Sequence, residues 1–142
     1  MYSTYGFEDL SVVISHKAMG QLTLQGAGVG TITFAKSNDV STHDVAADGS
    51  VMTSKIKVRN GTVAITIQQT SDAHAWFTKL FNYLESAPLR EWTGTSLMAT
   101  SSDMKVTHEC SYMSPQKQPD KAYQQQGQQI TWTFLAADMK EY

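Results

Sequence analysis

The chain has 142 residues, of which 41% are hydrophobic and 17% charged, and its formal net charge is −2 at pH 7. This length suits a single domain, and the apolar fraction can fill one core, so a wholly disordered chain is excluded. The slight negative charge argues against a protein whose main task is to grip nucleic-acid phosphates. The single cysteine excludes both a disulfide framework within the chain and a zinc site built from cysteines. We expect neither a membrane span nor a signal peptide, because the sequence lacks the apolar stretches that they require.

Several segments alternate apolar and polar residues with a period of two, which is typical of strands with one buried face. The first covers residues 10–16, where Leu10, Val12 and Ile14 share a face with His16. The second begins at Gln21, and Gly26-Ala27-Gly28 after it indicates a bulge or a bend. Further alternating segments cover residues 31–34, 62–68 and 129–134.

Two dipeptides predict hairpin turns. Asp48-Gly49 and Asn60-Gly61 readily adopt the positive φ angles of a type I′ turn, and strand-like segments flank both. Together they predict a three-strand meander over about residues 39–69, with residues 51–59 as its middle strand.

One segment has helical spacing instead. Its apolar residues form a single broad stripe, which predicts a helix over about residues 72–86 that packs on a sheet or plugs the end of a barrel. Thr70 or Ser71 can cap its start, and Pro88 ends it. Residues 114–129 form the predicted loop before the last strand. The stripe contains Ala73, Trp76, Phe77, Leu80, Phe81 and Leu84.

Candidate catalytic residues are sparse. His108 and Cys110 share one face of a predicted strand with Val106 and Tyr112, which could form a thiol–imidazole pair or half a metal site. A buried small thiol beside a core histidine is the better interpretation. Asp44 and Asp48, with His43 and Ser50 nearby, could form a carboxylate site, but no apolar wall is present to raise the pKa of a carboxyl group. We therefore expect no enzyme, no cofactor and no metal.

The charged residues between positions 39 and 59 show a pattern. Lys55, Lys57 and Arg59 follow each other at every second position, so one strand face would carry all three. They form either a solvated face or a basic stripe for an acidic partner. The neighbouring acids are Asp39, Asp44 and Asp48, which would pair either inside the hairpin or between copies of the protein.

Long segments carry no charge at all. Residues 20–35, 60–71 and 122–137 contain no Lys, Arg, Asp or Glu, although each spans a predicted strand. Monomeric β proteins place charges on exposed strands to prevent edge pairing. The missing charges therefore indicate strands that are paired in an assembly.

The order of these features resembles the tail tube proteins of contractile-tailed bacteriophages. The resemblance is strongest over the first 90 or so residues, and the remainder follows the family only in pattern. It is carried by Tyr5-Gly6-Phe7-Glu8-Asp9-Leu10-Ser11-Val12-Val13-Ile14-Ser15-His16, Asn38-Asp39, His43-Asp44-Val45-Ala46-Ala47-Asp48-Gly49-Ser50-Val51-Met52, Ser54-Lys55-Ile56, Arg59-Asn60-Gly61-Thr62-Val63 and Gln68-Gln69-Thr70-Ser71.

The resemblance implies a mainly β fold, an antiparallel β-barrel or sandwich with one α-helix at about residues 72–86, in a single domain covering residues 1–142. It implies a virion protein that forms six-membered rings stacked into a tail tube, with sheath, tape-measure and baseplate proteins as partners. DNA would pass through without sequence-specific binding. We expect the channel wall to lack Lys and Arg, because cations there would bind the phosphates and slow the passage of DNA. The inter-ring contact is then expected at Asp39, Asp44, Asp48, Lys55, Lys57 and Arg59. The lumen or inter-subunit face is expected to include Thr31, Thr33, Thr62, Thr66, Thr131 and Thr133.

Three alternatives stay open. The tube protein of the type VI secretion system has a similar architecture. A monomeric carbohydrate-binding β-sandwich would use exposed aromatic residues such as Trp92, Tyr112 and Tyr123. A small hydrolase would need a pocket with a perturbed acid or base, for which the sequence offers no candidate.

Overall fold

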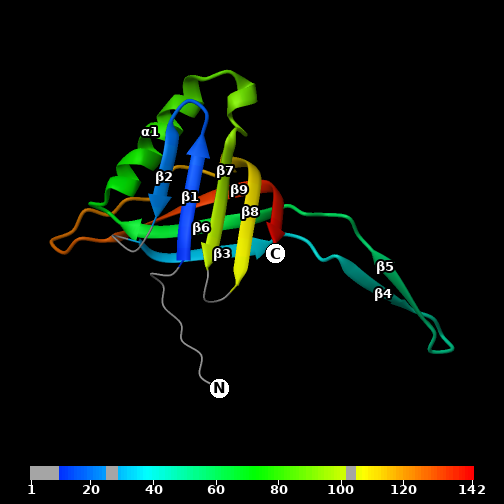
Figure 1. Cartoon of the computed structure of the whole chain (residues 1–142). Coiled ribbons are helices and arrows are strands. Elements are labelled where there is room, and N and C mark those ends of the chain that lie inside the picture. The colour runs from blue at the N-terminus through cyan, green and yellow to red at the C-terminus, as the bar shows by residue number, and fades with distance from the viewer. Residues whose placement is uncertain (1–9, 25–28, 102–104) are drawn as a thin grey trace.

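Seven antiparallel strands form one sheet in the computed structural model, in the order β2-β1-β7-β8-β9-β6-β3 (Figure 1). The structure describes residues 10–24, 29–101 and 105–142. The two remaining strands, β4 and β5, pair only with each other among these residues. The strands are β1 (Leu10–His16), β2 (Gly20–Leu24), β3 (Val29–Lys36), β4 (Ser41–Val45), β5 (Val51–Lys55), β6 (Gly61–Gln68), β7 (Thr95–Ser101), β8 (Val106–Pro115) and β9 (Gln129–Glu141). The helices are α1 (Asp72–Ser86) and the short 3-10 helix η2 (Leu89–Glu91).

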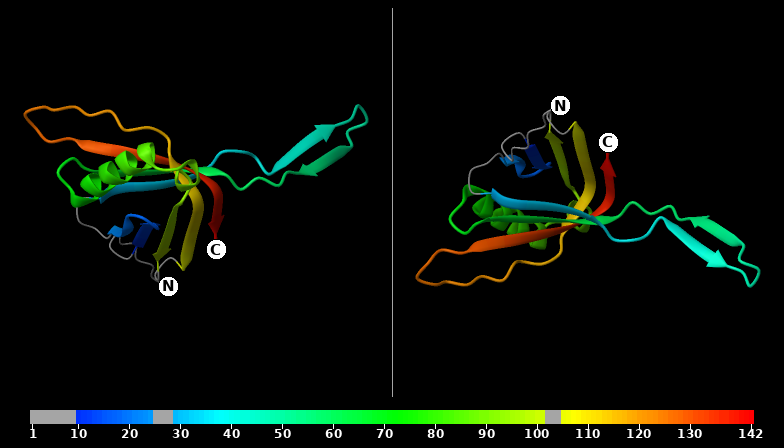
Figure 2. Two further views of the ribbon diagram at one scale, coloured as in Figure 1. Left: turned by 90° about the horizontal axis from the view of Figure 1, so that it is seen from above. Right: turned by 90° about the horizontal axis from the view of Figure 1, so that it is seen from below.

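The sheet is curled into a half-barrel (Figure 2). The reason lies where β8 and β9 bend together. In both strands the buried positions skip two residues, from Cys110 to Met113 and from Ala136 to Met139, and these positions face each other in register. Tyr112 lies in this step with a positive φ of 53°. Against β7, strand β8 also carries one extra residue, since Met113 pairs with Thr95 but Cys110 pairs with Leu97. Such a bulge bends a strand and increases its twist, so the two halves of the sheet turn toward each other.

The core fills the concave side of the half-barrel and is closed by α1. Trp132 and Phe134 of β9 lie under Phe77 of the helix, with ring centroids 5.6 and 5.5 Å from it. The helix begins where the sequence predicts, since Ser71 Oγ accepts a hydrogen bond from the His74 N–H at 3.3 Å. The predicted helix and the mainly β, antiparallel fold are therefore confirmed.

The Asp48-Gly49 hairpin is confirmed, but its turn is not type I′. Val45 and Val51 face each other in register, and the Gly49 N–H donates to the Ala46 carbonyl at 2.9 Å. A type I′ turn needs positive φ at both central residues, whereas here only Gly49 has it, at 88°. This pattern is typical of a type I turn followed by a glycine bulge.

The Asn60-Gly61 hairpin and the three-strand meander are wrong. β6 pairs with β3 and β9, so the β4–β5 hairpin is an insertion between two paired strands. Pairing on both sides buries Val63, Ile65 and Ile67, which a local hairpin with β5 would leave half exposed. Gly61 serves close packing instead of a turn, because a Cβ there would lie 2.6 Å from the Ala35 carbonyl oxygen.

The remaining segments of the chain differ from the predicted elements in smaller ways. β7 was not predicted, because its alternating positions hold small residues such as Ala99 and Ser101. The predicted loop is shorter at both ends, since β8 reaches Pro115 and β9 begins at Gln129. The predicted bend at Gly26-Ala27-Gly28 lies outside the described residues. Among those described, no helix has the length and apolar character that a membrane span requires.

Candidate functional site

The six threonines that were predicted to share a functional face lie together on the outer side of β3, β6 and β9. Neighbouring strands align them in rows, since Thr66 lies opposite both Thr31 and Thr131. In the next row Ala64 separates Thr33 from Thr133, and in the third Thr62 lies between Ala35 and Leu135. We call these nine residues the threonine face. It is uncharged, and its side chains point away from the core because Val63, Ile65 and Ile67 occupy the alternate positions of β6.

A second polar surface lies on the other half of the sheet. The outer side of β1, β7 and β8 carries a groove of about 440 Å³, in which Ser15 Oγ and Ser96 Oγ lie 3.0 Å apart. Val13 and Met98 add apolar contacts, and Glu109 is its single charged lining residue. Sequence reasoning missed this surface because β7, its central strand, was not predicted.

Residues 38–59 form an arm that projects from the body beside β9, at the opposite end from the loop of residues 116–128 (Figure 2). Every residue of β4 and β5 is exposed on both faces of the two-stranded ribbon. These include large apolar side chains, with Val45 66% and Met52 61% exposed. An isolated two-stranded hairpin is at best marginally stable in water, so such an arm is typical of a segment that a partner covers.

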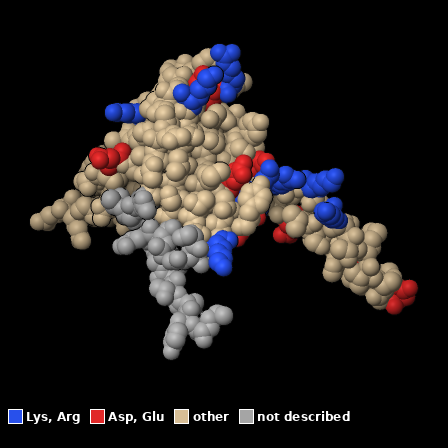
Figure 3. Space-filling view, in the orientation of Figure 1, with Lys and Arg blue, Asp and Glu red and all other residues tan. Residues whose placement is uncertain are grey.

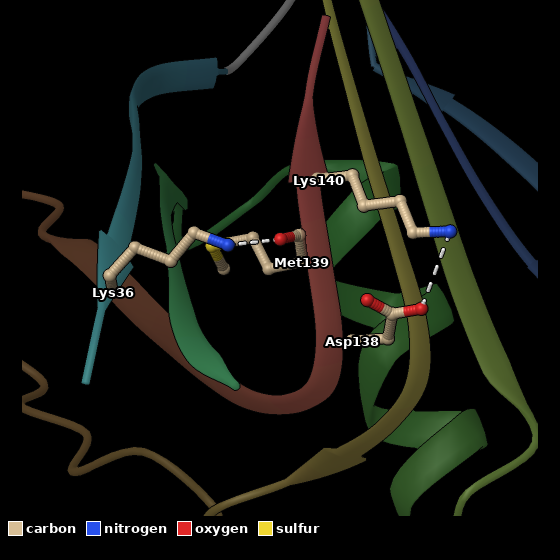
Figure 4. A network of polar contacts seen from close by, with 4 residues as sticks. All are labelled: Lys36, Asp138, Met139 and Lys140. Atoms are coloured by element: carbon tan, nitrogen blue, oxygen red, sulfur yellow. Dashed lines mark hydrogen bonds and ion pairs between the residues drawn. The ribbon is translucent and has the colours of Figure 1, made fainter. Parts of the chain in front are cut away.

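The root of the arm is held firmly on the body. The Met139 N–H of β9 donates to the Arg59 carbonyl at 2.8 Å. The Lys36 ammonium, at the end of β3, donates to the Met139 carbonyl oxygen (Figure 4). Asp138 and Lys140 on either side form an ion pair at 3.6 Å. The arm therefore leaves the body from a fixed point.

The prediction that Lys55, Lys57 and Arg59 share one strand face is wrong. β5 ends at Lys55, and the other two follow in the link to β6. The three cations instead lie at the root of the arm together with Asp39, whereas Asp44 and Asp48 lie toward the tip. In Figure 3 the blue side chains gather near the root of the arm, and a red side chain marks its tip.

Pairing of Asp44 with Lys55 inside the hairpin is also excluded by register. Asp44 lies opposite Met52, whereas Lys55 lies opposite Ser41, so the two charges project from opposite faces. Across the described part of the chain, the one ion pair is that of Asp138 with Lys140. The six charged residues of the arm thus have no ion-pair partner among the residues that the structure describes.

Asp48 keeps its charge at the tip. The Ser50 hydroxyl and the Ser50 N–H both donate to its Oδ1, at 2.6 and 3.0 Å. These hydrogen bonds lower the pKa of the Asp48 carboxyl, because they favour the ionised form. The tip of the arm therefore carries a negative charge at neutral pH.

The candidate catalytic groupings do not assemble. Cys110 is fully buried, and burial raises the pKa of its thiol to about 11, so the thiol is unreactive at neutral pH. The His108 ring stacks on Phe34 with centroids 4.2 Å apart. Tyr112 does not share their face, because the bulge turns it to the surface, where it is 65% exposed. In the described ranges no three His, Cys, Asp or Glu side chains could hold a metal ion.

The aromatic platform of a carbohydrate-binding module is not formed by the proposed set. Trp92 packs against the core, with its ring edge-on to Phe81 at a centroid distance of 6.4 Å. Tyr123 is exposed in the loop before β9, and Tyr112 lies on the bulge of β8.

Solved structures of contractile injection assemblies contain chains with the same fold. The chain is similar to a chain of the anti-feeding prophage baseplate, with a TM-score of 0.65, 11% identity, and coverage of 100% of this chain and 97% of that one. It is also similar to a chain of the PVC extracellular contractile injection system, in its extended sheath–tube complex. There the TM-score is 0.62 at 10% identity, and the match covers 99% of this chain and 92% of that chain.

Sequence comparison identifies the family. Residues 2–142 match the family described as the bacteriophage PhiTE tail tube protein. No curated protein matches the sequence. The chain belongs to this tail tube family, so it is a structural component of the virion tail and not an enzyme. The predicted resemblance is confirmed.

Proposed function

We propose that this protein forms six-membered rings that stack into the inner tube of a contractile phage tail, and that DNA passes through the tube. The observation that carries the proposal is the arm of residues 38–59, whose two strands are exposed on both faces and whose charges of both signs have no ion-pair partner among the described residues. A chain that functioned as a monomer would gain nothing from such an element, whereas a stacked ring can use it to reach the next ring.

The threonine face is the wall that we assign to the channel. It is uncharged over three rows of three strands, and the Thr66 and Thr131 hydroxyls are hydrogen-bonded to each other at 2.9 Å. Duplex DNA binds proteins mainly through phosphate contacts with Lys and Arg. A hydroxyl-lined wall without cations lets the phosphates pass without holding them.

Sheath, tape-measure and baseplate proteins are the partners that this role implies. The solved structures with the same fold include a sheath–tube complex and a baseplate. A tube built from this chain would present its outer surface to a sheath and its end rings to a baseplate, while the tape-measure protein would occupy the channel before DNA.

Reversal of the basic charges at the arm root tests the stacking role. The triple change Lys55→Glu, Lys57→Glu and Arg59→Glu should leave the fold intact, because all three side chains are exposed. One surface ion pair contributes only about 0–1 kcal/mol, but a six-membered ring would multiply the loss of each pair by six. We expect negative-stain microscopy to show tubes for the natural protein and only separate rings for the variant.

The matched control reverses three exposed cations on the body, Lys17, Lys79 and Arg90, so that the change in net charge is the same. This control should still form tubes. Tubes of normal length from the arm variant would show that the arm charges are merely solvated. A single monomeric boundary in sedimentation of the natural protein, at all concentrations up to about millimolar, would contradict assembly itself.

A further inference from the structure

A groove of about 660 Å³ lies at the root of the arm, between the arm and β9. Val40, Ile56 and Val58 provide apolar lining, and Ala137 of β9 forms part of the opposite wall. Three cations, Lys55, Lys57 and Arg59, also line it. We call this the root groove.

The charge of the root groove is positive. Its one acidic lining residue, Asp138, is already paired with Lys140 at 3.6 Å. The three cations have no such partner in the described part of the chain. The groove is therefore suited to an acidic segment that also has apolar side chains.

The tip of the arm has that composition. It carries Asp44 and Asp48 together with the exposed apolar residues Val45, Val51 and Met52. The Asp48 carboxyl is held in its charged form by Ser50. Tip and root groove are therefore complementary in both charge and hydrophobic character.

The two surfaces cannot meet within one chain. β4 and β5 are paired along their whole length, from Ser41–Lys55 at the root to Val45–Val51 near the tip, so the ribbon separates its own two ends. A contact between them must join two copies, and it is heterologous, because the patch on one copy differs from the patch on the next. Such contacts propagate instead of closing as a two-fold dimer.

We propose that the arm tip of one copy docks in the root groove of a second copy in the next ring. This inference rests on the proposed ring-to-ring role of the arm and adds the seat into which the arm fits. It places the tip acids beside the root cations of the next copy, so each subunit both gives and receives one contact.

Disulfide trapping tests the contact directly. Ala47 at the tip and Ala137 in the groove are both exposed, and Ala75 on the outer side of α1 is an equally exposed control. The natural Cys110 is buried and unreactive, so it can remain. The Ala47→Cys and Ala137→Cys proteins are mixed under mild oxidation, and each is also mixed with the Ala75→Cys control. The disulfide-linked heterodimer of the first mixture should form at least about tenfold faster than that of either control mixture, because docking raises the effective thiol concentration. Adding Lys57→Glu and Arg59→Glu to the Ala137→Cys protein should remove this advantage. Equal rates for all three mixtures would overturn the proposed seat.

The variant with both Ala47→Cys and Ala137→Cys separates this inference from the proposed stacking. A tip-to-groove contact between rings should give a covalent ladder that extends beyond six subunits on a denaturing gel. A ladder that stops at six subunits would support the tip-to-groove contact but place it within one ring, which contradicts the stacking role of the arm. Dimers alone would mean that two tips or two grooves meet, and they would overturn the inference even if microscopy shows normal tubes.

Discussion

Trp132 places a polar group in the middle of an otherwise apolar core. Its side chain is fully buried, and its indole N–H donates to His74 Nδ1 at 3.1 Å. Burial, and then the nearby Lys121, lower the pKa of the His74 imidazole. Both effects favour the neutral ring, which is the form whose Nδ1 can accept this hydrogen bond. The hydrogen bond between Trp132 of β9 and His74 of α1 therefore depends on the protonation state of the His74 imidazole.

The pair predicts that stability falls in mild acid. In the unfolded chain His74 takes up a proton near its ordinary pKa of 6.5, whereas in the folded chain this pKa is lower. The unfolded state therefore binds more protons at pH values between the two pKa values, and the free energy of unfolding decreases as the pH falls below about 7. Urea unfolding followed by tryptophan fluorescence, at several pH values, measures this decrease.

Two variants isolate the histidine. His74→Leu should lose about 1–3 kcal/mol at pH 8, since the buried indole N–H is left without an acceptor, and its stability should depend less on pH. His43→Leu, on the exposed arm, should follow the natural protein. Equal pH slopes for His74→Leu and the natural protein would show that other groups cause the acid effect.

At the scale of elements, α1 closes the core with only part of its apolar stripe. Ala73, Phe77, Leu80 and Leu84 are buried, whereas Trp76 and Phe81 lie half-buried at its margin. The spacing of the stripe predicts a helix, but the curvature of the sheet decides how wide a part of the stripe it covers. The six apolar residues of the stripe therefore contribute unequally to the stability of the fold.

Truncation of two neighbouring aromatic residues measures this difference. Phe77→Ala should cost about 3–5 kcal/mol, because it removes a fully buried ring between Trp132 and Phe134. Trp76→Ala should cost clearly less, since its ring is already partly in water. Chemical denaturation compares the two, and equal losses would mean that Trp76 is covered as fully as Phe77.

At the scale of the whole molecule, charge is separated by surface. The threonine face has none, while the arm carries six charged residues without an ion-pair partner in the described ranges. This separation agrees with a tube in which one surface must not bind DNA and another must bind the next ring. The proposed function accounts for both surfaces with one arrangement.

Placing cations on the threonine face tests its assignment to the channel. Thr33→Lys with Thr131→Lys should leave the fold intact, because both side chains are exposed. Tubes of this variant should retain short duplex DNA at low salt and release it as salt rises, whereas natural tubes should not retain it. Thr100→Lys, on the exposed side of β7, is the control. Retention by the control alone would place the channel on the other half of the sheet.

Local periodicity in the sequence predicts a large part of the secondary structure. The alternation in residues 10–16 and 129–134 and the helical stripe of residues 72–86 predicted elements that the structure contains, because side-chain direction follows directly from backbone geometry. The same alternation predicted that Thr62 and Thr66, or Thr131 and Thr133, share a face. The position of the Asp48-Gly49 turn is likewise predictable from the sequence, since a single glycine with positive φ closes it.

Which strands are neighbours depends on packing across the whole chain. Asn60-Gly61 favours a turn locally, yet burial of β6 between β3 and β9 outweighs that preference and makes the hairpin of residues 38–59 an insertion. Register then brings threonines from three distant strands into one face, and it sets Asp44 and Lys55 on opposite sides of the arm. Pairing between distant strands depends on the burial that the whole chain achieves, which no local pattern encodes.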